Sequence, residues 1–426
     1  MRKMKDSGVE WIGEIPADWQ THRIKVNFQI ITGNGFPPQF QGMVGEQYPM
    51  CKASDISYAD KCLCTAANSV SEEVVKEQRF NIIPSGSILF AKIGEAMKKN
   101  NRAINVIPCC IDNNCQAMVP HKINKDFGYY IFSVIDLNEF DNGGTVPCIN
   151  NQKLRDYFIP YPSVDEQQHV ADYLDCKCSQ IDTIIARQQE VIEKLKAYKL
   201  SIITEAVTKG LNPDVPMKDS GVEWIGEIPE HWTMLKLKYA SSILRGKFNH
   251  RPRNDPAYYD GNHPFVQTGD VARANKYIKN YSQTLNEKGY AVSKEFPANS
   301  ICMTIAANVG DVAILTFDAC FPDSVVGFVP SDNIAWNYLY YVLTAMKKQF
   351  VRNAIISTQL NLNIEIIKEE FIPVAPIHIQ EQISRFLDDK CFAIDRTISA
   401  KQCVIDKLTD YKKSLIYEVV TGKKEV

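Results

Sequence analysis

Two segments of the chain carry the hydrophobic spacing of a long amphipathic helix. From Gln167 to Thr208 there is neither Gly nor Pro, and apolar residues recur three or four positions apart. Pro160 and Pro162 precede this segment and Gly210 follows it, as start and stop signals for a helix. A second segment, which ends at Gly422, repeats the spacing with Ile383, Leu387, Cys391, Ile394, Ile398, Ile405, Leu408, Leu415 and Val419. The pattern predicts two long helices.

An apolar stripe runs along the whole length of each predicted helix, and an isolated helix would leave that stripe exposed to solvent. The first segment would form a rod about 60 Å long at the rise of an α-helix. The simplest partner is the other helix, in an antiparallel coiled coil with pseudo-two-fold symmetry. The alternative is that each helix packs only on its own domain. The polar positions on the stripes either set the register or are solvated, and they are Gln188, Lys199, Lys401 and Lys412.

The rest of the chain has the pattern of mixed α/β domains. In the two stretches of about 20–157 and 233–370, short β-rich runs such as Val312–Leu315 alternate with turn residues. Phe127–Leu137 and Trp336–Met346 have helical spacing, and we expect their aromatic residues to pack in a core. The expected fold class is α+β, with two mixed α/β domains joined by two long helices.

The chain is an internal duplication. The sequence MKDSGVEWIGEIP occurs at Met4–Pro16 and again at Met217–Pro229, and the offset of 213 positions is half of the 426 residues. The same offset links Trp19 with Trp232, Phe158-Ile159-Pro160 with Phe371-Ile372-Pro373, Leu174-Asp175 with Leu387-Asp388, and Tyr198-Lys199 with Tyr411-Lys412. Residues 20–157 and 233–370 diverge and require small insertions. Each repeat therefore has a constant frame around a variable interior.

Composition places the chain among ordinary globular proteins. It is 45% hydrophobic and 23% charged, and no apolar run approaches the ~18 residues that span a bilayer. No hydrophobic signal segment follows Met1–Asp6, so we expect a cytoplasmic protein. The 13 cysteines are an odd number without zinc-ligand spacing, so we expect reduced thiols and no metal site.

The positive charge gathers in the variable interiors. The whole chain has a formal net charge of −2, which argues against a generic nucleic-acid binder. Residues 20–157, however, contain 14 Lys/Arg and 13 Asp/Glu, and residues 233–370 contain 15 and 12. The frame is therefore acidic, whereas both interiors are mildly basic.

Each interior has one basic cluster. The second contains Arg245–Asn254, which combines four permanent cations with two Asn and a His, and the first contains Lys98–Arg102. Arg and Asn form bidentate pairs with guanine and adenine edges, and Lys binds phosphate. The alternative is an ordinary solvated loop. The candidate DNA-binding residues are Lys98, Lys99, Asn101, Arg102, Arg245, Lys247, Arg251, Arg253 and Asn254.

No catalytic motif is recognisable in the sequence. Gly422-Lys423 lacks the upstream glycine of a phosphate-binding loop, and there is neither a GxGxxG segment nor an HExxH segment. We therefore expect a protein that is not an enzyme. Two alternatives are a duplicated coiled-coil scaffold or adaptor without DNA specificity and, less favoured, a self-contained DNA methyltransferase.

Several separated motifs together resemble one family. SGVEWIGEIP followed by a Trp, at Ser7–Pro16 and Ser220–Pro229, is similar to the opening of each half of the specificity (S) subunit of type I restriction-modification enzymes. The helical segment also resembles that family's helical region, because it has the same motifs in the same order: Phe-Ile-Pro, Glu166-Gln167, Leu174-Asp175 and a terminal Thr-Lys-Gly at 208–210. Phe371–Gly422 repeats the order with two departures, Ile379 in place of the Glu and an end that reads Thr421-Gly422-Lys423. The resemblance covers nearly the whole chain.

The resemblance implies a division of labour along the chain. Residues 1–157 and 217–370 would be target recognition domains, each of which reads one half of an asymmetric bipartite site in double-stranded DNA. Residues 158–216 and 371–426 would be helical spacers that set the gap and dock two methyltransferase (M) subunits. Two endonuclease/translocase (R) subunits would complete the complex. Methylation and cleavage would reside in these partners, which would also bind S-adenosylmethionine, ATP and Mg, so this chain would bind no cofactor.

Overall fold

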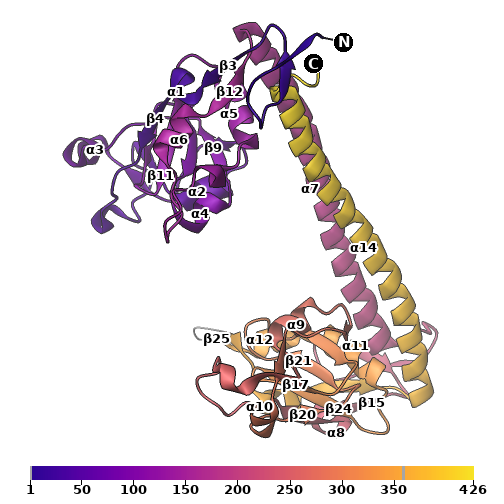
Figure 1. Cartoon of the computed structure of the whole chain (residues 1–426). Coiled ribbons are helices and arrows are strands. Elements are labelled where there is room, and N and C mark those ends of the chain that lie inside the picture. The colour runs from indigo at the N-terminus through magenta and orange to yellow at the C-terminus, as the bar shows by residue number, and fades with distance from the viewer. Residues whose placement is uncertain (1, 357–359) are drawn as a thin grey trace. The chain divides into compact units, whose positions relative to one another are not determined.

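The computed structural model describes residues 2–356 and 360–426, and it divides into two compact units. Unit 1 comprises residues 1–188 and 403–426, and unit 2 comprises residues 189–402. Each unit contains one variable interior together with parts of both long helices (Figure 1). The domain boundaries expected from the sequence, 1–157, 158–216, 217–370 and 371–426, stay a prediction.

The two long helices are α7, Val164–Lys209, and α14, Ile377–Val420. In unit 1, Lys412 of α14 donates hydrogen bonds to both carboxylate oxygens of Asp182 in α7, at 2.6 and 2.7 Å. In unit 2, Lys199 of α7 donates to both oxygens of Asp395 in α14, at 2.7 Å. In each unit the early part of one helix therefore pairs with the late part of the other. This confirms the antiparallel coiled coil.

The helices also pack on the interiors, so the two packing alternatives are combined. In unit 1, Leu174 of α7 and Val419 of α14 are buried in one apolar cluster with Phe127 of the first interior. In unit 2, Val207 of α7 and Leu387 of α14 share a cluster with the second interior. Each interior thus rests on the start of one helix and the end of the other.

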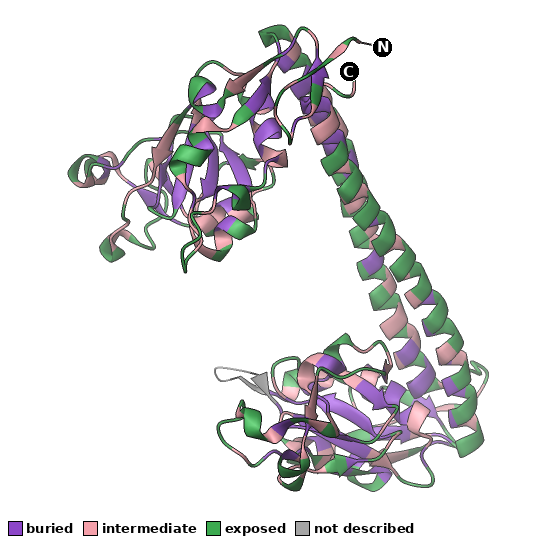
Figure 2. Ribbon diagram, viewed as in Figure 1, coloured by how far each residue is buried: buried purple, intermediate pink, exposed green. Residues whose placement is uncertain are grey.

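The interiors are built on the same five-stranded sheet. In unit 1 the order is β4 (Phe28–Thr32), β11 (Cys115–Pro120), β8 (Ile88–Ala91), β9 (Arg102–Asn105) and β6 (Cys62–Leu63). In unit 2 it is β16 (Ser241–Arg245), β24 (Val325–Pro330), β21 (Ile301–Thr304), β22 (Val312–Leu315) and β18 (Tyr277–Ile278). In both sheets only the last pair is parallel. The central strands are buried, as their purple colour shows (Figure 2).

A second, smaller sheet differs between the units. In unit 1 it has three strands, β10 (Cys110–Ile111), β5 (Tyr48–Cys51) and β7 (Ser69–Val70). In unit 2 it has four, β19 (Gln283–Leu285), β17 (Tyr259–Phe265), β23 (Ala319–Cys320) and β20 (Glu295–Phe296). The divergence predicted for the interiors is therefore concentrated in this sheet and its loops.

The duplicated sequence forms the same hairpin twice. β1 (Met4–Asp6) pairs with β2 (Glu14–Pro16), and β13 (Met217–Asp219) pairs with β14 (Glu227–Pro229) in an identical register. The following Trp19 and Trp232 are each 1% exposed. Gly422 ends α14 with φ of +72° and lies so close to Pro16 that a Cβ would come within 2.4 Å of that ring. The stop signal read from the sequence is thus also a packing requirement.

Short strands close each interior onto its frame. β3 (Gln20–Arg23) pairs with β12 (Phe158–Tyr161), and β15 (Thr233–Lys236) pairs with β27 (Phe371–Val374). The remaining elements are α1 (Ile24–Asn27), α2 (Ala53–Tyr58), α3 (Glu72–Gln78), α4 (Gly94–Lys98), α5 (Lys125–Val134), α6 (Asn151–Asp156), α8 (Leu237–Ala240), α9 (Thr268–Arg273), α10 (Glu287–Ala291), α11 (Trp336–Ala345), α12 (Lys347–Asn353), α13 (Ile364–Glu369), β25 (Ile355–Ile356), β26 (Leu360–Asn361) and the 3-10 helices η1 (Pro38–Phe40), η2 (Leu137–Phe140) and η3 (Pro256–Tyr258).

Candidate nucleic-acid interface

The basic cluster of unit 2 lies on an exposed loop that leaves the edge strand β16. Arg245 is the last residue of that strand, and Gly246 turns the chain against Pro322, whose carbonyl oxygen lies 2.3 Å from where a Cβ would stand. Only glycine permits so close an approach. Lys247, Arg251, Arg253 and Asn254 follow, and all four are exposed. The loop therefore projects four of its five candidate side chains from a fixed starting point.

Three arginines of this cluster converge on Asp323. Arg253 Nη2 lies 2.6 Å from Asp323 Oδ2, and Arg251 Nη2 lies 3.4 Å from the same oxygen. Arg245 Nε donates to the Asp323 carbonyl oxygen at 2.6 Å. The Arg251 and Arg253 side chains are still 54% and 50% exposed, so both remain accessible to solvent. Asp323 thus holds a group of guanidinium ions together without covering it.

Aromatic contacts hold the loop in place. His250 stacks on Tyr258 with 3.8 Å between ring centroids, and its Nε2 lies 2.9 Å from Asp255 Oδ2. Tyr259 donates a hydrogen bond to the Arg253 carbonyl oxygen. Arg251 Nη1 donates to the Phe248 carbonyl oxygen at 2.8 Å. These bonds restrict the loop backbone, so that the arginines lose less freedom when they bind a ligand.

The cluster of unit 1 lies at a different place in the sheet. Lys98 ends α4 and pairs with Glu95 at 2.7 Å, Lys99 caps that helix and is exposed, and Asn101 is half-buried. The turn thus connects β8 to β9, whereas the basic loop of unit 2 follows β16. The two clusters are not counterparts within the repeats.

Arg102 does not fit the expected surface role. It is 6% exposed, donates to the Asn100 carbonyl oxygen at 2.9 Å and to the Ile135 carbonyl oxygen, and lies over the Phe132 ring. Burial lowers its pKa to about 10. The expectation that Arg102 contacts DNA stays a prediction, and the burial of its side chain argues against it. The signal was in the sequence, because Arg102 opens the otherwise uncharged strand Arg102–Asn105.

The counterpart of the basic loop in unit 1 is the exposed segment that follows β4. Gly33 there approaches the Asp112 carbonyl oxygen so closely that a Cβ would lie 1.9 Å from it, as Gly246 does in unit 2. The segment has few charges, and Lys52 reaches over its Phe36 ring and to Gln41 Oε1 at 3.3 Å. Charge clustering in the sequence did not identify these residues, because the segment is polar without being basic.

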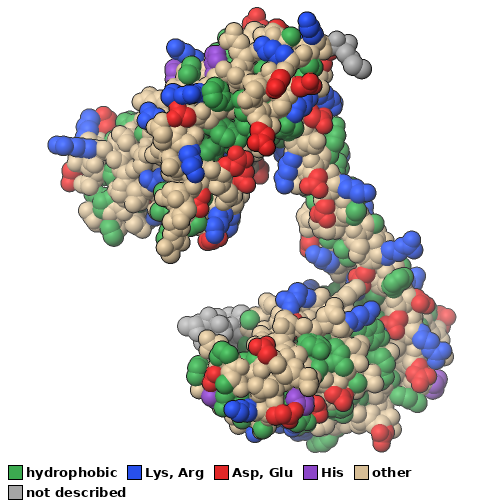
Figure 3. Space-filling model, viewed as in Figure 1, with side chains coloured by type: hydrophobic (Ala, Val, Ile, Leu, Met, Phe, Trp, Pro, Cys, Tyr) green, Lys and Arg blue, Asp and Glu red, His purple; other side chains and the backbone are tan. Residues whose placement is uncertain are grey.

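Positive and negative side chains are interspersed on the visible face of each interior (Figure 3). On the face drawn in Figure 3, Lys and Arg side chains alternate with Asp and Glu over both interiors. Phosphate binding by many cations would need a continuous positive surface. The arrangement is better suited to a few directed contacts from Arg and Asn than to nonspecific binding along the DNA backbone.

Other kinds of site are not evident in the part of the chain that is described. Among residues 2–356 and 360–426, there is no group of three or more metal-ligating side chains. All 13 cysteines are free thiols. No helix in the described ranges is long and apolar enough to cross a membrane.

Comparison with known proteins identifies the family. The model of the type I restriction modification DNA specificity domain matches residues 16–194 and 229–402. The chain is 26% identical to the putative type I restriction enzyme MjaX specificity subunit of Methanocaldococcus jannaschii, over 97% of this chain and 95% of that protein. It is 23% identical to the EcoDI specificity subunit of Escherichia coli, over 96% and 90%.

A solved structure shares the fold. A chain from a study of complex assembly and conformational transition of the type I R-M system matches with a TM-score of 0.69 at 14% identity, over 96% of this chain and 99% of that one. The scaffold without DNA specificity and the self-contained methyltransferase are set aside, because both matched segments are DNA specificity domains. The chain belongs to the type I restriction-modification specificity subunits, which recognise DNA sequence and leave catalysis to the other subunits with which they assemble.

Proposed function

We propose that each repeat reads one half of an asymmetric bipartite target in double-stranded DNA. The observation that carries this proposal is one sheet order repeated in both units with different loops at the same edge. Because the sheet is the same in both units, each interior places its loop at the same edge of the sheet. Different loops give the two interiors different base preferences, so the two half-sites differ.

The exposed arginines of unit 2 are the main base-reading candidates. Arg251 and Arg253 are about half exposed beside Asp323, and a guanidinium can form two hydrogen bonds with guanine O6 and N7. Lys247 and, in unit 1, Lys98 and Lys99 are suited to phosphate contacts. Asn101 and Asn254 are suited to adenine.

The frame would dock two methyltransferase subunits. Large apolar side chains are exposed at repeat-related positions: Phe158 and Phe371 are 36% and 38% exposed, and Tyr198 and Tyr411 are 58% and 51% exposed. An apolar residue exposed at the same place in both repeats is expected where two copies of one partner bind. Two endonuclease/translocase subunits would join the complex through the methyltransferases.

The helices would set the gap between the half-sites, and the chemistry would lie in the partners. Each half-site reader packs on both α7 and α14, so the length of the helices determines the spacing. S-adenosylmethionine, ATP and Mg would be bound by the partner subunits and none by this chain. The complex would act in the cytoplasm.

Methylation profiling tests the proposal. The chain is expressed with its methyltransferase subunit in a host without other adenine methylation, and modified positions are mapped by long-read sequencing. We expect one motif of two different half-sites separated by a fixed gap of unspecified bases. A continuous or palindromic motif would contradict reading by two different domains.

A further inference from the structure

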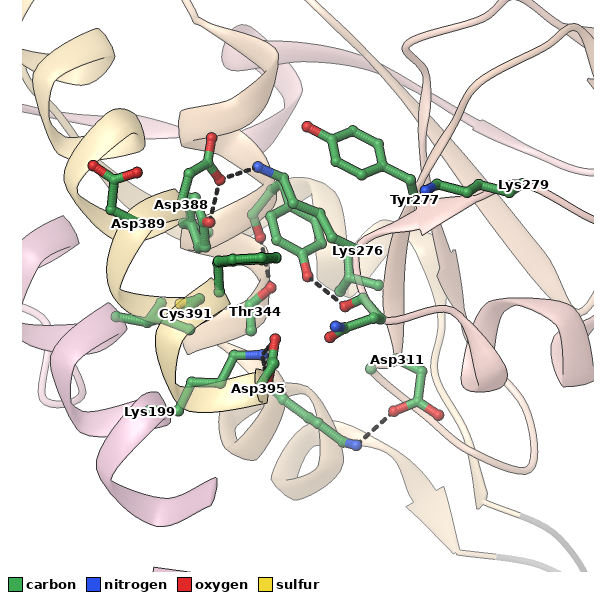
Figure 4. A pocket seen from close by; sticks show the side chains of 18 residues that line it. Lys199, Lys276, Tyr277, Lys279, Asp311, Thr344, Asp388, Asp389, Cys391 and Asp395 are labelled. Carbon is green, nitrogen blue, oxygen red and sulfur yellow. Dashed lines mark hydrogen bonds and ion pairs between the residues drawn. The ribbon is translucent and has the colours of Figure 1, made fainter. Parts of the chain in front are cut away.

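One carboxylate of α14 joins three elements of unit 2. Asp388 forms an ion pair with Lys276 and accepts a hydrogen bond from the Tyr341 hydroxyl of α11 at 2.5 Å (Figure 4). Lys276 immediately precedes the sheet edge strand β18, and its carbonyl oxygen accepts from Ile314 N of β22 at 2.8 Å. The carboxylate therefore joins the sheet and the helix of the second interior to the long helix.

Aromatic rings enclose the lysine of this group. Lys276 Nζ lies 4.8 Å from the Tyr341 ring centroid, 5.2 Å from that of Tyr277 and 5.4 Å from that of Tyr340. Its side chain is only 13% exposed. A buried cation loses much of its hydration, so the attraction to Asp388 is screened less than at an open surface.

The same group occurs in unit 1. Asp175 of α7 forms an ion pair with Lys61 and accepts from the Tyr130 hydroxyl of α5 at 2.5 Å. Lys61 precedes β6, and its carbonyl oxygen accepts from Ile104 N at 2.8 Å. Burial lowers the pKa of Lys61, but the hydrogen bonds to Asp175 and Asp126 outweigh it and raise the pKa overall.

The group is kept although the interiors around it diverge. The two Asp are 213 positions apart, Tyr130 and Tyr341 are 211 apart, and Lys61 and Lys276 are 215 apart. Insertions and deletions have therefore changed the chain between the three residues, and their contacts with one another are kept in both units, while Lys61 also pairs with Asp126 at 2.9 Å. The basic loop that follows β16 and the segment that follows β4 differ in this respect, because they share no charge pattern.

A second connection lies two turns earlier on each long helix. Gln167 and Gln380 are 0% exposed. Their Oε1 atoms accept from Asn124 N and Ala335 N, each at 2.9 Å, just before α5 and α11. The eight residues from each Gln to its Asp give a separation of about 12 Å along the helix. Two separated connections oppose rotation of the interior on the helix, which one alone would allow.

In unit 2 the Asp388 connection borders open space. A cavity of about 830 Å³ is lined by Lys276, Asp388 and four further charged residues of ion pairs, Lys199, Asp395, Lys347 and Asp311. Figure 4 shows Lys276 directed toward Asp388, and Lys199 of α7 directed toward Asp395 of α14. The polar contacts thus lie beside the apolar cluster that contains Leu387, and they add to the connection between interior and helix.

We propose that Lys276–Asp388–Tyr341 and Lys61–Asp175–Tyr130 are orientation latches, positioning residues that hold each recognition domain at one angle on its long helix. The inference rests on the proposed function, in which two half-sites are read at a fixed gap. Their rotational phase along DNA then depends on this angle. Loosening a latch widens the range of gap lengths that is accepted and leaves the bases of each half-site unchanged.

The test uses the full chain assembled with its methyltransferase subunits. The substrate is a plasmid library in which both half-sites are separated by the natural gap or by gaps one or two base pairs shorter or longer than it. Asp388→Asn and Asp175→Asn each weaken one latch. We expect methylation at neighbouring gap lengths to rise about tenfold relative to the natural gap, as the loss of one charged hydrogen bond allows. Half-site base preferences are expected to stay as in the wild type.

Asp389→Asn is the matched control, because Asp389 is the exposed next residue of α14 and points away from Lys276 (Figure 4). If an Asp variant does not assemble, Tyr341→Phe decides, since it removes one hydroxyl and keeps the ring. An unchanged gap profile in assembled variants, or altered base preferences, overturns the latch. A wild type without any bipartite target overturns the proposed function itself, and the latch with it.

Discussion

Arg253 Nη2 lies 2.6 Å from Asp323 Oδ2, so an exposed cation of the basic loop Arg245–Asn254 is held by an acidic residue of the same interior. Arg251 reaches the same oxygen at 3.4 Å. The carboxylate reduces the charge of the loop and orients the guanidinium groups. Such an arrangement weakens the nonspecific attraction of the loop to phosphate groups and favours directed contacts with bases.

Asp323→Asn is expected to change affinity and discrimination in opposite directions. Loss of the negative charge strengthens binding to unrelated DNA, and loss of orientation lowers the preference for the target about tenfold, within the range of one bidentate base contact. Fluorescence anisotropy with target and scrambled duplexes at moderate salt measures both. Asp332→Asn, an exposed acid of the same interior, serves as the control. A parallel change on both duplexes would indicate a charge effect alone.

Arg253→Ala and Lys247→Ala are expected to have different effects. Arg253 is oriented by Asp323, so its loss weakens target binding by about 1–3 kcal/mol and relaxes specificity. Lys247 is exposed on the same loop, and its loss weakens binding to all DNA sequences equally. It also reduces the slope of log affinity against log salt concentration by about one. Titrations over a range of salt concentrations separate the two. Equal effects on specificity would contradict these roles.

Arg251→Ala is expected to affect the loop as well as the DNA. Besides meeting Asp323, Arg251 donates to the carbonyl oxygens of Phe248 and His250 at 2.8 and 2.7 Å. Its removal frees the backbone, so target affinity falls and amide hydrogen exchange in residues 247–255 rises. Unaltered affinity at moderate salt would show that this basic loop is only solvated.

Arg102→Ala is expected to lower stability and to spare DNA contacts. The buried guanidinium satisfies two carbonyl groups, and leaving these unpaired costs about 1–3 kcal/mol each. Thermal unfolding of unit 1 measures the loss. Lys99→Ala on the neighbouring exposed turn provides the comparison, with little effect on unfolding and weaker DNA binding. A stable Arg102→Ala protein with specifically lost DNA binding would contradict the structural role.

The extent of the helices was predictable because their apolar spacing is local. The segment Gln167–Thr208 became α7, Val164–Lys209, and Trp336–Met346 became α11, Trp336–Ala345. The orientation latches were not predictable. Lys61 lies 114 positions from Asp175, and Tyr130 lies 45 positions from it, so no local pattern connects them. Arg102 was expected at the surface because it stands in a cluster of charges, whereas its place at the start of the otherwise uncharged strand Arg102–Asn105 indicates burial.

Changing the length of the helix is expected to change the gap. Ile192 is 2% exposed in the packed part of α7. Four residues inserted or deleted beside it correspond to about one helical turn, or ~6 Å of rise. Methylation profiling of the variant is expected to show the same half-sites with a different gap. The same gap as in the wild type would refute the role of the helices in spacing.

The most direct test of the whole account is an exchange of residues 20–157 for the equivalent segment of another specificity subunit. The hybrid is assembled with its methyltransferase, and the methylated motif is mapped in the host genome. Two independent readers on one frame predict that one half-site changes and that the other half-site and the gap remain. A change in both half-sites would contradict the account.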